Sequence, residues 1–313
     1  MTWMTPDRPS LAARLGLPTG TRAIILNADD FGMCHAANTA IGSLLERGRI
    51  DSATVMVPCA WAPEALAFAA GRRDLDVGVH LVLTSEWRRY RWRPLTGPGT
   101  TLVDGDGFFP NEVAAVEQGA SEADVAAELT AQVQAALDAG VDVTHLDNHM
   151  GSVYGLQSGR DFLRPVFELA ARLGLPFRLP RYREGAEADQ ELQAKLAEAT
   201  AAADALGVEI IDRLWTHPFE LAGEGTAQEE TYERVRDGFL DVLRAVPPGV
   251  TEIYLHPMTD GAELRAAVDF GAAKRGYELR LLDDPLVEQT IDDEGLVRVG
   301  WRDLRDLQRG AAR

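Results

Sequence analysis

Short apolar runs alternate with longer segments of helical periodicity along most of this chain, and this alternation constrains the fold more than any other feature. One helix, for example, is predicted to begin after Ser121 and to end at Gly140. Strands that alternate with helices form parallel crossover units. We therefore predict an α/β fold, a distorted (β/α) barrel of about seven parallel strands, with a doubly wound open sheet as the alternative. The runs predicted as strands are 22–27, 52–57, 76–83, 142–146, 176–180, 208–212 and 250–255.

Charge and composition narrow the class of protein. The chain carries 31 Lys and Arg against 49 Asp and Glu, a net charge of −18, which disfavours nucleic acid and anionic membranes as partners. Its two cysteines lack the spacing of a zinc knuckle, and neither a signal peptide nor a membrane-spanning run is visible. We expect a cytoplasmic protein that acts on a small molecule or an oligosaccharide, and a homodimer is compatible with the sequence.

Residues 84–120 interrupt the alternation and hold Trp87, Tyr90 and Trp92 among Gly, Pro and Asp. A loop of this length in a compact fold is usually functional, and the turn signal at 104–107 predicts a small hairpin within it. We interpret the segment as an aromatic-rich insertion over the active-site face of a single catalytic domain, 1–313. Its aromatic side chains suit stacking on sugar rings or packing of the loop. Its local positive charge, which suits an anionic group or a neighbouring subunit, comes from Arg88, Arg89, Arg91 and Arg93.

Polar residues with catalytic potential fall at the ends of the predicted strands. Asp29 and Asp30 follow the first strand, and His80 lies near the end of the third. His149 follows the fourth strand, and His256 follows a late one. The carboxyl ends of parallel strands gather on one face of a barrel and build its active site. These side chains are therefore expected to converge although they are far apart in sequence.

Such a set suits a divalent metal ion. One carboxylate and two imidazoles leave coordination positions open for water and substrate, with zinc or magnesium as the expected ion and manganese or cobalt as alternatives. The ion would acidify a bound water. The other aspartate of the pair would stay free as a general base, provided that a turn eased by Gly32 brings both carboxylates to one side. Taken singly, an Asp-Asp pair also fits a turn, and a lone His fits a hydrogen-bonded core position.

Four motifs hold these polar residues, namely residues 27–32 (NADDFG), 78–81 (GVHL), 144–149 (THLDNH) and 256–257 (HP). These motifs resemble the YdjC/ChbG family of carbohydrate deacetylases. The order and the rough spacing of these motifs match the family as well, and the resemblance covers most of the chain. The resemblance implies a distorted (β/α) barrel and the removal of acetyl groups from N-acetylated sugars.

The resemblance also implies roles for single residues. It implies that Asp30, His80 and His149 hold one divalent metal ion. It implies that Asp29 is the general base. His256 matches the late histidine of the family and would protonate the leaving amine.

Two further histidines can each be interpreted in two ways. His145 either orients a metal ligand or makes a hydrogen bond within the strand end. His217 either lines the site or packs in the core. Family members continue after the His149 position with more histidines, whereas this chain has residues 150–152 (MGS) there. The identity of the sugar is therefore not predicted.

Two other functions stay open at the level of the sequence. A sugar isomerase or a phosphoesterase on a similar barrel would also use a metal ion, although such sites usually carry more carboxylates or a Gly-rich phosphate loop. A non-catalytic sugar-binding relative would keep the fold without the reaction. The complete set of Asp and His residues favours the hydrolase over both.

Overall fold

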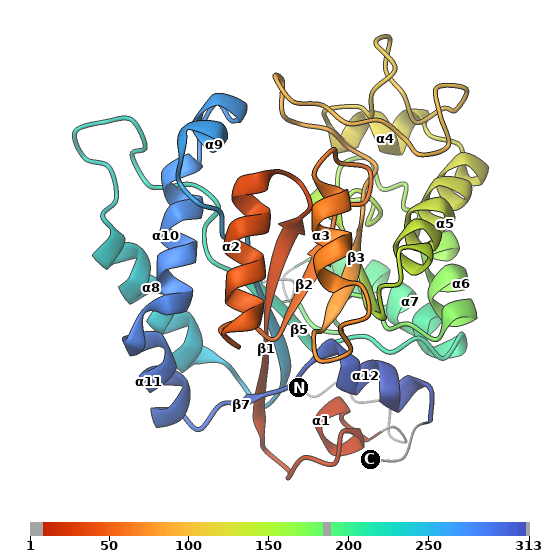
Figure 1. The fold of residues 1–313 in the computed structure, drawn as a ribbon. Coiled ribbons are helices and arrows are strands. Elements are labelled where there is room, and N and C mark those ends of the chain that lie inside the picture. Colours follow the sequence, from red (N-terminus) through yellow and green to blue (C-terminus); the bar gives the residue numbers. More distant parts are fainter. Residues whose placement is uncertain (1–8, 184–188, 311–313) are drawn as a thin grey trace.

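The structure is a computed structural model that describes residues 9–183 and 189–310. Within these residues, seven parallel strands form one sheet that curls into a half-barrel with helices around it (Figure 1). This architecture confirms the predicted α/β barrel-like class. The strands are β1 (Arg22–Phe31), β2 (Ser52–Val55), β3 (Val77–Leu81), β4 (Val143–Asn148), β5 (Arg213–Thr216), β6 (Gly249–Leu255) and β7 (Val297–Arg298).

The order of the strands places β1 in the middle of the sheet. The order is β4-β3-β2-β1-β6-β5, and the short β7 pairs with the beginning of β1. Because the strands are parallel, their carboxyl ends lie together at one end of the half-barrel, the upper end in Figure 1. The residues that follow β1, β3, β4 and β6 thus arrive at the same end of the molecule.

Helices cover the outer face of the sheet and bury the larger of two apolar clusters. Ile24 and Leu26 of β1 lie in this cluster together with Ile41 of α2 and Leu129 of α5. None of the helices in the described part of the chain is long and apolar enough to cross a membrane. The helices are α1 (Leu11–Arg14), α2 (His35–Glu46), α3 (Ala62–Ala69), α4 (Val113–Gly119), α5 (Glu122–Asp138), α6 (Leu163–Leu173), α7 (Gln190–Ala205), α8 (Tyr232–Ala245), α9 (Ala262–Ala267), α10 (Ala272–Asp283), α11 (Pro285–Asp293) and α12 (Trp301–Gln308), with the 3-10 turn η1 (His149–Gly151) after β4.

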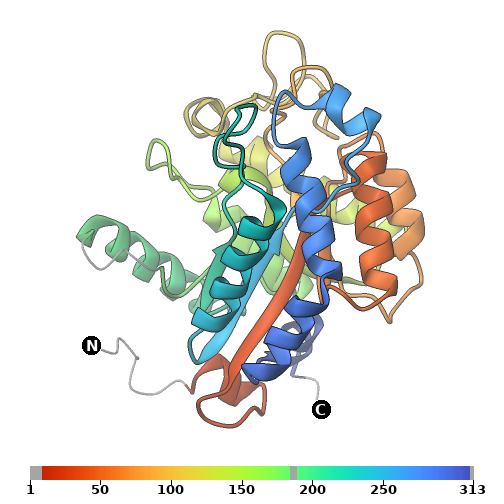
Figure 2. The same cartoon turned by 90° about the vertical axis from the view of Figure 1, so that its left-hand side faces the viewer.

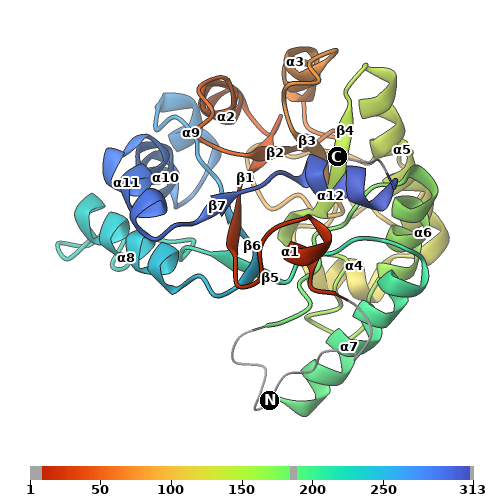
Figure 3. The same ribbon diagram turned by 90° about the horizontal axis from the view of Figure 1, so that it is seen from below.

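The inner face of the half-barrel is apolar at its lower end and polar above. Side chains alternate along a strand, so Ala23, Ile25, Asn27 and Asp29 of β1 share the inner face. The first two belong to the smaller apolar cluster, which α1 and α12 close from below (Figure 3). The apolar cluster therefore supports a buried polar layer beneath the carboxyl ends of the strands, whose members include Asn27, Ser52, Thr54, His145, Asp147 and Glu252.

Two extended segments close the wall between the edge strands, and they correct two of the strand predictions. Residues 176–180 and 208–212 are not regular strands. Their backbones instead bond to each other and to β4, as in the hydrogen bond from Arg178 N–H to Leu146 O (2.9 Å). Regular strand pairing next to these two segments begins only with β5. The predicted number of strands is confirmed, but two of the seven, β5 and β7, were not predicted, and β7 is too short to show a pattern in the sequence.

The predicted insertion, 84–120, holds no regular strand and ends in α4. The predicted turn is present, because Gly107 N–H donates to Asp104 O (3.1 Å), but the two strands of a hairpin are not. Trp87 and Trp92 are buried, and their ring centroids lie 6.3 Å apart. Both aromatic side chains thus pack within the loop, and Trp87 also lines the pocket described below.

Candidate active site

The two aspartates at the end of β1 face the same side because the backbone changes direction at Asp30. Asp30 has a φ of 69°, in the left-handed region, and the pairing of β1 with β2 shifts register between Ala28 and Phe31. A residue other than glycine adopts this conformation at a cost of about 1–2 kcal/mol. The change in direction turns the Asp30 carboxylate towards the side that Asp29 already faces. The predicted turn therefore exists, and Gly32 continues it with a φ of 86°.

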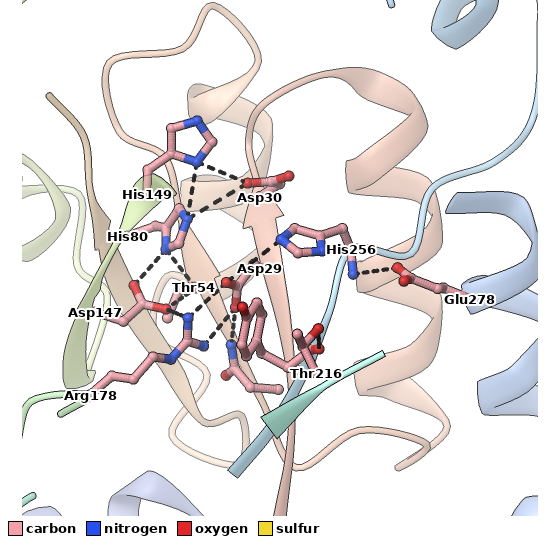
Figure 4. Close-up of polar contacts among 12 residues, drawn as sticks. Asp29, Asp30, Thr54, His80, Asp147, His149, Arg178, Thr216, His256 and Glu278 are labelled. Atoms are coloured by element: carbon pink, nitrogen blue, oxygen red, sulfur yellow. Dashed lines mark hydrogen bonds and ion pairs between the residues drawn. The ribbon is translucent and has the colours of Figure 1, made fainter. Parts of the chain in front are cut away.

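The three side chains predicted as metal ligands meet above the polar layer (Figure 4). Asp30 Oδ1 lies 3.7 Å from His80 Nε2 and 3.5 Å from His149 Nδ1. The two imidazole nitrogens are 3.3 Å apart, and all three residues are buried. Asp30 Oδ1 has no hydrogen-bond partner among the described residues, which is unfavourable for a buried carboxylate oxygen. One oxygen and two nitrogens in this arrangement fit a single divalent cation.

Each of the two imidazoles is oriented by a carboxylate on its other nitrogen. His80 Nδ1 donates to Asp147 Oδ1 (2.6 Å), which leaves Nε2 for a cation. His149 Nε2 donates to Glu86 Oε2 (2.9 Å), which leaves Nδ1. Burial disfavours a charged imidazole, but Glu86 and Asp30 outweigh it and raise the pKa of His149 to about 10. Glu86 comes from the predicted insertion, and no pattern in the sequence pointed to it.

Asp29 is held in place by a buried arginine. Arg178 donates to both carboxylate oxygens of Asp29 (2.6 and 2.7 Å). The same guanidinium contacts Asp147 (2.9 Å) and Glu252 (2.7 Å). Burial alone would raise the pKa of Asp29, but Arg178 lowers it to about 2. Asp29 is therefore a fixed and ionised carboxylate. Arg178 lies in an extended segment without a motif, so the sequence analysis missed it.

His256 faces Asp29 from the end of β6 (Figure 4). Its Nε2 lies 4.0 Å from Asp29 Oδ2, and its backbone N–H donates to Glu278 Oε2 in α10 (2.7 Å). Burial lowers the pKa of His256 to about 4, so its ring is neutral near pH 7. The neutral ring therefore lies next to the ionised Asp29 carboxylate, at a separation that suits a pair of groups that handle protons.

These groups open into one large pocket of about 1600 Å³. Its polar wall includes Asp29, Asp30 and His256, whereas aliphatic and aromatic side chains such as Phe167 and Leu196 line the side of α6 and α7. The helix α7 projects from the side of the molecule (Figure 2) and lengthens this wall. Typical small-molecule pockets enclose roughly 300–1,000 Å³. The pocket therefore has room for an extended ligand.

The two histidines with open interpretations occupy packed positions outside the lining of this pocket. His145 lies in the polar layer, where its ring stacks on Trp301 of α12 with the centroids 4.7 Å apart. His217 lies 2.5 Å from the Lys274 ammonium, measured from its Nδ1 atom. Both surroundings fit a structural role, and a part for either residue at the site stays a prediction.

Comparison with known proteins identifies the family. Residues 23–293 match the family model described as YdjC-like protein. A protein of Thermus thermophilus named carbohydrate deacetylase is 35% identical over 301 residues, which cover 95% of this chain and 98% of that relative. The chain belongs to the YdjC-like family.

A second relative and a solved structure are also similar to this YdjC-like chain. A carbohydrate deacetylase of Thermoanaerobacter pseudethanolicus is 26% identical over 284 residues, 90% of this chain and 99% of the relative. A crystal structure from Enterococcus faecalis, whose provisional name refers to cellobiose-phosphate cleavage, has a TM-score of 0.69 at 24% identity and covers 91% of this chain and 99% of its own. That similarity concerns the fold. The resemblance drawn from four short motifs is thus confirmed at the level of the family.

Proposed function

We propose that this protein is a metal-dependent hydrolase that removes the N-acetyl group from an N-acetylated sugar or oligosaccharide and releases acetate. The observation that carries the proposal is the convergence of Asp30, His80 and His149 around a buried carboxylate oxygen that has no hydrogen-bond partner among the described residues. An oxygen and two imidazole nitrogens suit zinc, or magnesium as the alternative. The names of the relatives support the carbohydrate and the acetyl parts of the proposal.

The residues around the ligands suit the proton transfers of amide hydrolysis. When bound, the cation would polarise the acyl carbonyl and acidify a water molecule. Asp29 accepts a proton from the attacking water, because Arg178 keeps its carboxylate ionised and fixes its direction. A carboxylate with a pKa of about 2 holds this proton weakly. His256, which is neutral and 4.0 Å away, receives it and delivers it to the leaving nitrogen as the C–N bond breaks.

Replacement of the predicted ligands tests the proposal. Asp30→Ala and His149→Ala are expected to lose bound metal and acetate release, because each removes one of three ligands. Metal content is measured by mass spectrometry, and acetate is measured over a panel of N-acetylated mono- and oligosaccharides. His35→Ala is the matched control, since His35 is half-exposed, pairs with Glu64 and lies outside the pocket.

Two results would reject parts of this proposal. Tight retention of metal by both ligand variants would show that these residues do not hold the ion. A parallel panel of phosphorylated sugars separates deacetylation from phosphate-ester hydrolysis, and release of phosphate without acetate would reject the assigned reaction.

A further inference from the structure

Two buried arginines line the pocket, and they differ in whether their N–H groups have hydrogen-bond partners. Arg178 donates to Asp29 and Glu252, as described above. Arg275 of α10 has a side chain only 7% exposed, yet its Nε and Nη1 have no hydrogen-bond partner among the described residues. Its Nη1 lies 3.8 Å from Asp30 Oδ2, which is beyond hydrogen-bond distance. Buried donors are rarely left unpaired in folded proteins, so this guanidinium is expected to meet a ligand.

The position of Arg275 is fixed by its neighbours. The Phe219 ring packs against the guanidinium, with Cζ 4.7 Å from the ring centroid. The Arg275 carbonyl accepts a hydrogen bond from Met258 N–H (3.2 Å), and Glu278 on the same helix accepts one from His256 N–H (2.7 Å). The helix α10 is thus tied to the loop after β6 at two points. These contacts hold Arg275 at a set place relative to His256.

We propose that Arg275 donates hydrogen bonds to the acyl oxygen of the substrate, an inference that rests on the proposed function. The reacting group has to reach Asp29, Asp30 and His256 at the same time. Arg275 borders this space, because it approaches Asp30 and packs on Phe219, whose ring also lies 5.0 Å from that of His256. An oxygen acceptor in this space meets a guanidinium whose Nε and Nη1 have no hydrogen-bond partner among the described residues.

The charge that develops on the acyl oxygen explains why the positively charged Arg275 guanidinium is useful at this position. The acyl oxygen gains negative charge when the water oxygen bonds to the acyl carbon, and it becomes a carbonyl again when the C–N bond breaks. A fixed donor in a site with little water stabilises the charged state more than the ground state. Arg275 would therefore act mainly on kcat and much less on KM.

The test compares Arg275→Gln and Arg275→Lys with Arg280→Gln in the full-length protein at saturating metal. Arg280 is a matched control, because it lies on the same helix, packs over the Tyr232 ring (3.5 Å) and lies outside the pocket lining. We expect Arg275→Gln to lower kcat for acetate release about 10²–10³-fold. Arg275→Lys keeps the charge but not the planar geometry, so a loss of about tenfold or more is expected. Arg280→Gln is expected to match the unmodified protein.

Binding of ¹³C-labelled acetate, followed by NMR titration, gives a second measurement that needs no turnover. Its dissociation constant is expected to rise about tenfold or more in both Arg275 variants, because a hydrogen bond to a charged group is lost. It should not change in Arg280→Gln. Thermal unfolding and metal content are measured for each variant, so that a loss of fold or of metal is recognised.

The outcomes separate the inference from its alternatives. A kcat within about threefold of the unmodified protein in Arg275→Gln would overturn it. Full activity and unchanged acetate binding in Arg275→Lys would also overturn it, since a positive charge beside Asp30 would then be sufficient. Failure of the proposed function looks different, because the unmodified protein would then release no acetate from any sugar of the panel.

Discussion

At the scale of single residues, the contact between Glu86 and His149 is expected to govern how the proposed metal site takes up a cation. The His149 ring is buried, which disfavours its charged form, but Glu86 and Asp30 raise its pKa to about 10. Below that pH the ring carries two protons in the metal-free protein. A metal ligand has to be a neutral imidazole, so a cation and a proton compete for the same ring.

Binding of a cation is therefore expected to release about one proton at pH 7, and affinity should rise with pH until about pH 10, where His149 is already neutral. Glu86→Gln should lower the His149 pKa and reduce the proton release. Titration calorimetry in buffers of different ionisation enthalpy measures this number. Glu64→Gln is the control, since Glu64 contacts the exposed His35. Equal proton release by the two variants would contradict the role of Glu86.

At the scale of secondary structure, β3 and β4 approach each other so closely that position 78 has no room for a side chain. A Cβ atom on Gly78 would lie 2.6 Å from the His145 ring and 2.7 Å from the His145 carbonyl oxygen. The close approach matters for the site, because the same pair of strands places His80 opposite Asp147. The glycine of the GVHL motif thus serves the orientation of a predicted metal ligand.

Gly78→Ala is expected to destabilise the protein by about 1–3 kcal/mol, because the strands must separate to admit the methyl group. Urea unfolding measures the loss. Gly105→Ala is a suitable control, since a Cβ atom there would meet nothing within 4 Å. A Gly78→Ala protein as stable as the Gly105→Ala protein would show that β3 and β4 are not packed as described.

The strength of the local pattern decided which elements the sequence could predict. The strands that carry Asp29 and His80 and the strand that precedes His256 are apolar runs with a polar residue at or near the carboxyl end, and all three are present. The segment around Arg178 bonds to partners that are distant in sequence, so its pairing has no local signal. Glu86 and Arg178 reach the site through tertiary contacts alone, and neither stands in a motif.

At the scale of the whole molecule, Arg178 joins three strands of the half-barrel through one charge. Its partners Asp29, Asp147 and Glu252 come from β1, β4 and β6, and all are buried. Burial, as the largest influence, raises the pKa of Glu252 to about 7 in spite of Arg178. The interior of the half-barrel therefore holds more acidic groups than the single positive charge of Arg178 can neutralise.

Arg178→Ala is expected to destabilise the protein by about 3–5 kcal/mol, because it leaves buried carboxylates without a counter-charge. Arg178→Lys should destabilise the protein less, since it keeps the positive charge but not the bidentate hydrogen bonds. Arg181→Ala is a control from the same segment, because Arg181 pairs with the single carboxylate of Asp204 (2.6 Å) nearer the surface. Denaturant unfolding of the three variants gives the comparison, and equal losses for Arg178→Ala and Arg181→Ala would contradict it.

The segment 84–120 contacts both the proposed metal site and a part of the pocket lining between α9 and α10. Glu86 contacts His149, and Arg89 pairs with Asp269 in the loop between α9 and α10 (2.8 Å). A coupling free energy between two sites acts equally in both directions. A cation bound at the proposed site would change the charge of His149 and thereby the attachment of this segment, and a ligand that displaces the segment would change the retention of the cation. Metal occupancy of the proposed site and access to the pocket are thus expected to be linked equilibria in this protein.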